Sequence, residues 1–127
     1  MFSEALEILD KEKHPYVYAL TKKNLGDTYS LLSKLENKEY NLEKAINFYK
    51  EASKIFKKNK YLYDYVNTKG YLGDVYFDLS QVKSTKEELN KAIESFKEAL
   101  SIAEKHGFTE IVREMKEILK DLKKEVS

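Results

Sequence analysis

The sequence predicts an all-α fold, an α-solenoid of about six helices arranged as antiparallel pairs. Two observations lead to this prediction. A segment of 41 residues recurs at a constant offset of 47 without a gap, and apolar residues inside each copy recur at helical spacing. Only one proline and four glycines interrupt the 127 residues, which makes a β-rich or disordered chain improbable.

The identical residues of the two copies fall mainly in two blocks. Residues 18–58 align with residues 65–105, and 18 of the 41 aligned pairs are identical. Because the blocks differ in character, each copy is expected to hold two helices. The first block is Leu25-Gly26-Asp27 with Tyr29, repeated as Leu72-Gly73-Asp74 with Tyr76; the second is Lys44-Ala45-Ile46 with Lys50-Glu51-Ala52, repeated as Lys91-Ala92-Ile93 with Lys97-Glu98-Ala99.

The helix boundaries follow from this register and from local end signals. Pro15 suits the first turn of a helix, and Gly107 suits a C-terminal cap. Ser84-Thr85 followed by Glu87-Glu88 suggests a capping box. The six helices are expected at roughly 2–13, 16–35, 41–58, 62–80, 86–106 and 109–125.

The register also extends past both ends of the doubled segment. Phe2, Ala5 and Ile8 lie 47 residues before Tyr49, Ala52 and Ile55, so the chain is expected to open on a second-type helix without its mate. Lys120 and Lys123 replace the glycine and tyrosine of the repeat, as expected of a polar terminal helix. A single domain over 1–127 is expected, with an unpaired helix at 1–14, repeats at 15–60 and 61–107, and a capping helix at 108–127.

A helical wheel predicts which residues pack. Leu25 shares a face with Thr21 and Lys22, and this face is expected to be buried. Gly26 lies at its edge, where the missing side chain allows another helix to approach, with Ala45 and Ala52 as small counterparts. The tyrosines at equivalent positions are expected in the core rather than in a base-stacking role: Tyr18, Tyr29, Tyr65 and Tyr76.

This order of small and large residues resembles the tetratricopeptide repeat. The resemblance rests on Leu25, Gly26, Tyr29, Ala45, Tyr49 and Ala52, and on their counterparts 47 residues later. The repeat departs in length, since the usual one has 34 residues, and Lys22 and Lys69 hold the place of the usual tryptophan. The resemblance implies a right-handed superhelix whose concave groove binds a peptide or helix of a partner protein.

The resemblance also implies which residues line that groove, on the face of each first-type helix opposite its packed side. Asp27, Asp74 and Asp121 recur at 47 and predict an acidic ladder for a basic or amide-rich segment. Phe77 and Tyr71 are expected as apolar anchors. The alternative is that these residues are solvated charges on exposed helices. The predicted partner-binding set is Lys23, Asp27, Ser30, Asn67, Tyr71, Asp74, Phe77, Glu117 and Asp121.

Composition disfavours several other functions. The net charge of +1 and a single arginine argue against nucleic acid as the main ligand, and the absence of cysteine removes thiolate chemistry. No catalytic, metal or cofactor motif is present, so no enzyme activity is expected. No apolar stretch approaches the roughly 20 residues of a membrane span, and a cytoplasmic location is expected.

Three classes of function remain open. The leading one is a protein-binding adaptor or scaffold. The second is a self-assembling protein that forms homo-oligomers through its N-terminal helix, which carries Phe2, Leu6 and Leu9. The third is an RNA-binding helical repeat, which the balanced charge disfavours.

Overall fold

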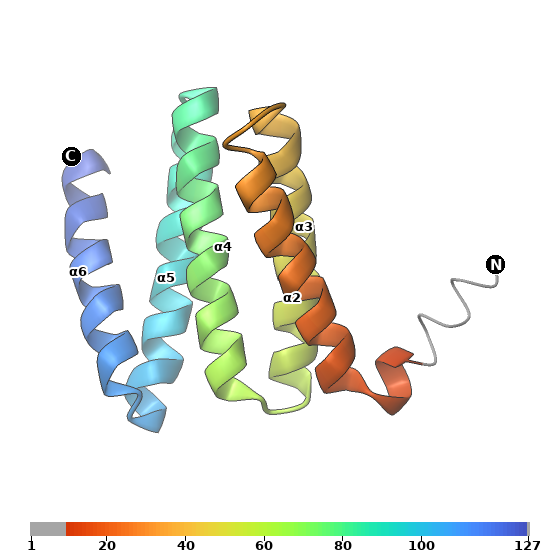
Figure 1. Cartoon of the computed structure of the whole chain (residues 1–127). Helices are drawn as coiled ribbons and strands as arrows, with labels where there is room; N and C mark the ends of the chain where they lie inside the picture. Colours follow the sequence, from red (N-terminus) through yellow and green to blue (C-terminus); the bar gives the residue numbers. More distant parts are fainter. Residues whose placement is uncertain (1–9, 127) are drawn as a thin grey trace.

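The computed structural model describes residues 10–126 and is helical almost throughout this range (Figure 1). Residues 10–13 are helical and lead into α2, so most of the helix expected at 2–13 lies outside the described residues. No strand occurs between residues 10 and 126, and the all-α fold class is confirmed. The five complete helices in that range are α2 (Pro15–Leu32), α3 (Lys38–Lys58), α4 (Leu62–Lys83), α5 (Lys86–His106) and α6 (Thr109–Val126).

The helices form two layers. In Figure 1, α2, α4 and α6 lie side by side in front, and α3 and α5 lie behind them. Each helix packs on the next one along the chain, so α2 with α3 and α4 with α5 make two hairpins and α6 follows the second. These are the predicted helix pairs. The layer of α2, α4 and α6 therefore presents the first-type helices on one side of the molecule.

The turns between helices explain the observed ends. Pro15 is the first residue of α2, and Gly107 ends α5 with a φ of 71°, as predicted for both. Three turns instead use a non-glycine residue with a positive φ: Asn37, Lys60 and Ser84. A side chain in this left-handed conformation crowds its own backbone, which costs roughly 1–2 kcal/mol.

The core runs through both hairpins without a break. Its most buried large side chains include Leu42 and Phe56 in the first hairpin and Val66 and Phe96 in the second. Complete burial of such a side chain contributes about 1.5–3 kcal/mol. Both α3 and α5 carry buried alanines that let their neighbours approach: Ala45 and Ala52, then Ala92, Ala99 and Ala103.

The two repeated glycines face aromatic rings. A Cβ atom built on Gly26 would lie 2.7 Å from Cδ1 of Tyr49, and one on Gly73 would lie 2.6 Å from Cζ of Phe96. The predicted close approach is therefore confirmed. The atoms nearest to each glycine belong to an aromatic ring of the facing helix, which the sequence did not single out, while Ala45 and Ala52 on the same helix as Tyr49 are fully buried.

The buried face predicted around Leu25 is also corrected. Leu25 is 36% exposed, whereas its equivalent Leu72 is 2% exposed. The reason is position in the array, because α3 packs against α4, whereas no helix within residues 10–126 takes that place beside α2. The tyrosines follow the same rule: Tyr65 and Tyr76 are buried as predicted, but Tyr18 and Tyr29 are only half-buried.

Candidate protein-binding face

All nine residues of the predicted binding set belong to α2, α4 and α6, and we call the layer of these three helices the front face (Figure 1). Lys23, Asp27 and Ser30 of α2 are half-buried, as are Asn67 and Phe77 of α4. Tyr71 and Asp74 of α4 and Glu117 and Asp121 of α6 are exposed.

Four side chains meet where α2, α3 and α4 come together. The Lys23 Nζ atom lies 3.0 Å from Asp27 Oδ2 and 5.2 Å from the centre of the Tyr71 ring. The Tyr49 hydroxyl donates a 2.5 Å hydrogen bond to Asp27 Oδ1, and the Tyr49 and Tyr71 rings lie 6.0 Å apart. Asp27 thus holds a cation and a hydroxyl at the same time, and its charge is already balanced within the fold.

Tyr49 was not among the predicted site residues, although it orders this cluster. Burial raises its pKa above the usual value for tyrosine, and the hydrogen bond to Asp27 raises it further. The hydroxyl therefore stays protonated and remains a donor. The Tyr49 ring packs on Gly26 and its hydroxyl reaches Asp27, the next residue of α2, a contact between helices that the periodicity of a single helix does not reveal.

Asp74 occupies the equivalent place in the second repeat but has a different environment. The residue 47 positions after Tyr49 is Phe96, which has no hydroxyl to donate. Within residues 10–126, no side-chain hydrogen bond or ion pair reaches the Asp74 carboxylate. The side chain touches solvent, yet crowding by neighbouring atoms removes enough hydration to raise its pKa to about 6, and the charge of Asp78 adds to this effect.

Asp78 lies one helical turn beyond Asp74. Loss of hydration raises the pKa of Asp78, and the positive charges of Lys38 and Lys34 act in the opposite direction. These lysines flank the turn between α2 and α3. The two carboxylates of α4 therefore differ, since Asp78 faces basic side chains and Asp74 faces Tyr49 and Asp78.

The remaining predicted residues lie apart from this cluster. Asn67 shares a hollow of about 370 Å³ with Glu114 and Phe108, at the end where α4 meets α6. Gly70 lets Met115 approach, because a Cβ built there would lie 3.3 Å from the terminal carbon of Met115. The structure does not bring Glu117 or Asp121 into contact with Asp74, and they remain separate exposed charges on α6.

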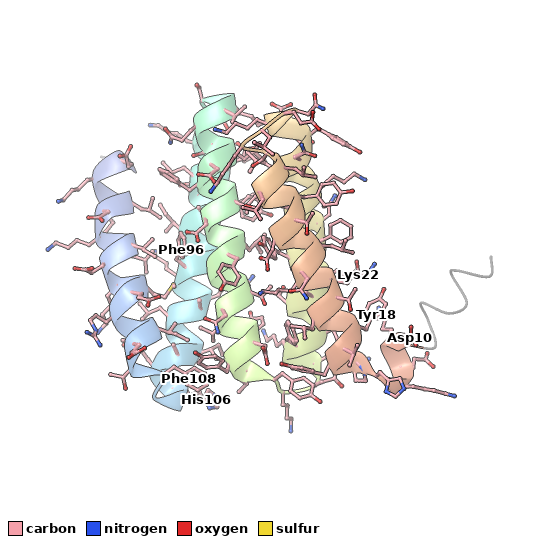
Figure 2. All side chains as sticks on the ribbon, viewed as in Figure 1. Asp10, Tyr18, Lys22, Phe96, His106 and Phe108 are labelled. Carbon is pink, nitrogen blue, oxygen red and sulfur yellow. The ribbon has the colours of Figure 1, made fainter. Side chains whose placement is uncertain are left out.

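A second repeated group ties each first-type helix to its partner. Tyr18 donates a 2.9 Å hydrogen bond to Glu51, and Lys22 lies 3.9 Å from the same carboxylate. At positions 47 residues later, Tyr65 and Lys69 contact Glu98. Tyr18 and Lys22 project from the outer edge of α2 in Figure 2. Lys22 and Lys69 thus each join the two helices of one hairpin.

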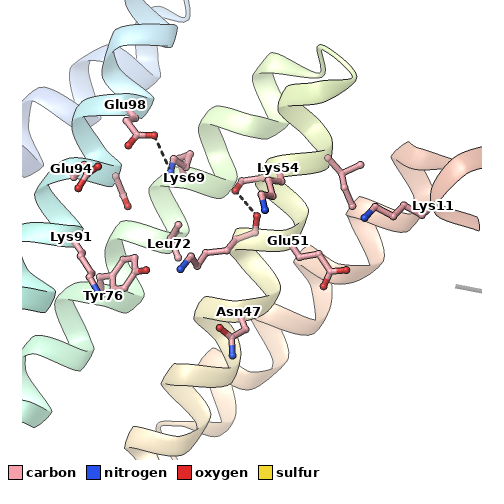
Figure 3. Close-up of a pocket in the computed structure, with 14 residues that line it drawn as sticks. Lys11, Asn47, Glu51, Lys54, Lys69, Leu72, Tyr76, Lys91, Glu94 and Glu98 are labelled. Carbon is pink, nitrogen blue, oxygen red and sulfur yellow. Dashed lines mark hydrogen bonds and ion pairs between the residues drawn. The ribbon is translucent and has the colours of Figure 1, made fainter. Parts of the chain in front are cut away.

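A further hollow lies in the other layer, between α3 and α5, and was not predicted. It has a volume of about 620 Å³, with Leu72 and Tyr76 of α4 at its floor. Figure 3 shows lysines and glutamates of both helices around it, including the ion pair of Lys69 with Glu98 at 3.0 Å. Its mixed charges favour no single ligand. Helical wheels missed it because it forms between helices that are not neighbours in sequence.

Other site types find no support within the described part of the chain. Residues 10–126 contain no group of three or more histidine, aspartate or glutamate side chains placed to hold a metal ion. None of the described helices combines the length and apolar character that crossing a membrane requires. His106 ends α5, and the centre of its ring lies 6.0 Å from the centre of the Phe108 ring in a stacked arrangement.

Comparison with known proteins identifies the repeat. Residues 73–106 match the family model of the tetratricopeptide repeat. No curated protein and no solved structure shows a significant match. The matched segment begins at Gly73 inside α4 and ends at His106, the last residue of α5, so it covers the glycine, the aromatic ring that packs on it and the whole second helix. Residues 73–106 are therefore similar to one tetratricopeptide repeat, and the chain around them is an all-α array of packed helices that is consistent with this repeat.

Proposed function

We propose that the chain binds an extended segment of a partner protein along the front face, and that Asp74 receives a lysine or arginine side chain of that segment. Tetratricopeptide repeats generally mediate protein–protein interaction and are typically non-enzymatic. The observation that carries the proposal is the contrast between two equivalent aspartates. Asp27 is held by Lys23 and Tyr49, whereas Asp74 is exposed and has neither kind of partner within residues 10–126.

The surroundings of Asp74 suit a cationic side chain. Tyr71 lies one turn before it on α4 and is 41% exposed. Lys23 already rests on this ring, so the ring accepts a cation at one face. A cation that approaches Asp74 also offsets the negative charge of Asp78 and favours the ionised carboxylate. Partner recognition would thus combine an ion pair with contact to an exposed aromatic ring.

The size of the effect follows from the type of contact. A hydrogen bond to a charged group contributes about 1.5–3 kcal/mol. Since about 1.4 kcal/mol corresponds to a tenfold change in affinity, loss of the Asp74 contact should weaken binding roughly 10- to 100-fold. Loss of the Asp27 charge should weaken binding less, because that charge is already neutralised by Lys23.

The test uses a fluorescent peptide in which lysines alternate with alanines, and a matched peptide that carries acetylated lysines. Fluorescence anisotropy at low salt measures binding of each peptide to the protein and to Asp74→Asn. Glu94→Gln is the matched control, because it removes one negative charge from α5, on the other layer. We expect Asp74→Asn to weaken binding of the lysine peptide at least tenfold more than Glu94→Gln does.

Two results would reject the proposal. One is equal affinity for the lysine peptide and its acetylated counterpart, which would show that no carboxylate of the protein recognises the cation. The other is an equal loss of affinity in Asp74→Asn and Glu94→Gln, which would show that only the net charge of the protein matters. The placement of Glu117 and Asp121 in the same binding surface stays a prediction.

A further inference from the structure

A hollow of about 370 Å³ lies where α4 and α6 begin, and we call it the α4–α6 hollow. Its lining includes Tyr63 and Asn67 of α4, Phe108 in the turn before α6, and Glu110 and Glu114 of α6. The Tyr63 and Phe108 rings meet edge to face, with their centres 5.4 Å apart and their planes at 86°. Figure 2 shows Phe108 at the lower end of the molecule, next to the turn between α5 and α6. The hollow therefore combines aromatic and acidic side chains.

The negative charge of the hollow is not balanced by a cation of the described chain. Glu110 and Glu114 are both exposed and lie one helical turn apart. Between residues 10 and 126, no lysine or arginine forms an ion pair with either carboxylate, and no lysine lies over either aromatic ring of the hollow. Other exposed rings of this chain do carry a lysine, since the Lys44 Nζ atom lies 5.6 Å from the centre of the Tyr40 ring. The hollow thus offers contacts to a cation that the described chain does not use.

The equivalent junction between α2 and α4 has a similar ring pair with a different setting. The rings of Tyr16 and Tyr61, 47 residues before the pair at the hollow, have centres 4.8 Å apart. Tyr16 also packs on a third ring, because the centre of the Phe56 ring lies 5.8 Å away. The residue 47 positions after Phe56 is Ala103, which has no ring. The ring pair beside the α4–α6 hollow therefore lacks this neighbour.

The carboxylates also differ between the two junctions. Glu110 and Glu114 stand 47 residues after Tyr63 and Asn67, so a ring and a neutral amide hold these places one repeat earlier. The carboxylate of the first junction, Asp64, accepts a hydrogen bond of 3.4 Å from an aromatic hydroxyl of the same junction. Within the described residues, the two carboxylates at the hollow accept no such bond. The acidic groups of the second junction are therefore the ones that remain open to a partner.

We propose that the α4–α6 hollow binds the cationic side chain of a lysine or arginine from a partner protein. A cation is attracted to the face of an aromatic ring. Tyr63 is 57% exposed and offers the more open ring, since the His106 ring stacks on Phe108. The N–H groups of the cation donate to the carboxylates of α6 and to the amide oxygen of Asn67. An acidic side chain gains neither contact, so the hollow is selective for basic residues.

One segment can reach both the hollow and Asp74. Asn67 precedes Asp74 by seven residues of α4, which is close to two helical turns. The two side chains therefore lie on the same side of α4, about 10 Å apart along its axis. An extended chain covers this distance in about three residues. The cation at the hollow is thus a second basic residue of the segment that meets Asp74, a step that rests on the proposed function.

The side-chain amide of Asn67 serves as a reporter, because it lines the hollow and its N–H groups give signals in ¹⁵N–¹H NMR spectra. An unlabelled peptide in which lysines alternate with alanines is titrated into the ¹⁵N-labelled full chain at low salt. The same peptide with acetylated lysines is titrated in parallel. Both titrations are repeated with Asp74→Asn, which removes the other contact. We expect the lysine peptide to shift the Asn67 signals in both proteins, with weaker binding in Asp74→Asn, and the acetylated peptide to leave them in place.

Two double variants test the carboxylates. Glu110→Gln with Glu114→Gln removes the charges at the hollow. Glu87→Gln with Glu94→Gln is the matched control, because it removes two exposed glutamates of α5, one of which lies in the first turn as Glu110 does in α6. The affinity for the lysine peptide, taken from the Asn67 shifts, should fall on the order of tenfold more in the hollow variant than in the control.

The outcomes separate the hollow from Asp74. Asn67 signals that stay in place when the lysine peptide saturates the wild type would overturn the proposal for the hollow and leave the one for Asp74 standing. Equal shifts with the acetylated peptide, or an equal loss of affinity in the two double variants, would overturn it as well. Asn67 shifts with unchanged affinity in Asp74→Asn would support the hollow and refute the Asp74 contact. Tyr63→Leu should weaken binding roughly threefold more than Tyr40→Leu, which removes an exposed ring of α3, and an equal effect would contradict the proposal.

Discussion

The contact between Gly73 and Phe96 provides the sharpest stability test of the fold. A Gly→Ala change inside a helix gains about 1 kcal/mol from lower backbone entropy in the unfolded chain. At Gly73 the new Cβ would lie 2.6 Å from the ring of Phe96, which is 1% exposed and has no space to withdraw. Overpacking of this kind costs about 1–3 kcal/mol. Gly73→Ala should therefore lower the free energy of unfolding by up to about 2 kcal/mol.

Gly70 in the same helix is the matched control. It is also buried, but its new Cβ would lie 3.3 Å from the end of the flexible Met115 side chain. Gly70→Ala should therefore keep most of the gain of about 1 kcal/mol. Urea unfolding followed by far-UV circular dichroism measures both variants. The reasoning is refuted if Gly73→Ala is as stable as Gly70→Ala, because the predicted difference is about 1–3 kcal/mol.

Three further predictions concern the turns, Asp74 and Tyr49. Lys60→Gly should stabilise the protein by about 1 kcal/mol in urea unfolding, because it relieves a φ of 63°. Lys54→Gly, at an exposed position inside α3, should destabilise it by about the same amount, and the same sign for both would contradict this. Because the pKa of Asp74 is raised from 3.8 to about 6 in the folded state, its protonated form stabilises the fold below pH 4, and this contribution is lost as pH rises through 6. Asp74→Asn should therefore raise the melting temperature relative to wild type at pH 7.5 more than at pH 4, and a pH-independent difference would exclude this. Tyr49→Phe should cost about 0.5–1.5 kcal/mol of unfolding free energy through loss of the bond to Asp27, and a loss no larger than that of Tyr40→Phe, an exposed tyrosine, would count against it.

The positions and pairing of the helices within residues 10–126 could be predicted because they depend on patterns that lie within one stretch of sequence. The offset of 47 predicted which segments are equivalent. Pro15 predicted the start of α2, and Gly107 predicted the end of α5. The exposure of Leu25 could not be predicted in this way. Periodicity shows that Leu25 and Leu72 hold equivalent faces, but only the neighbouring helix decides whether the face is covered.

The binding face shows the same limit. A helical wheel placed Asp27 and Asp74 on equivalent faces and suggested a uniform acidic ladder. The difference between them comes from the facing helix, where Tyr49 donates to Asp27 and Phe96 donates nothing to Asp74. The groove between α3 and α5 was not predicted for a related reason, because its walls come from two helices that are separated in sequence by α4. The chemical difference between the two repeats therefore arises from contacts between helices, and it cannot be deduced from the faces of single helices.

The equivalence of positions 47 residues apart is tested most directly by titrating the Asp74 carboxyl group by NMR in the wild type and in Phe96→Tyr. If positions 47 residues apart are equivalent in space, the new hydroxyl passes Gly73 and donates to Asp74 as Tyr49 does to Asp27. A hydrogen bond to the charged form lowers the pKa of an acid. We therefore expect Asp74 to titrate near 6 in wild type and clearly lower in Phe96→Tyr. An identical titration in both proteins would contradict the equivalence of the two repeats and, with it, the assignment of Asp74 as the open position.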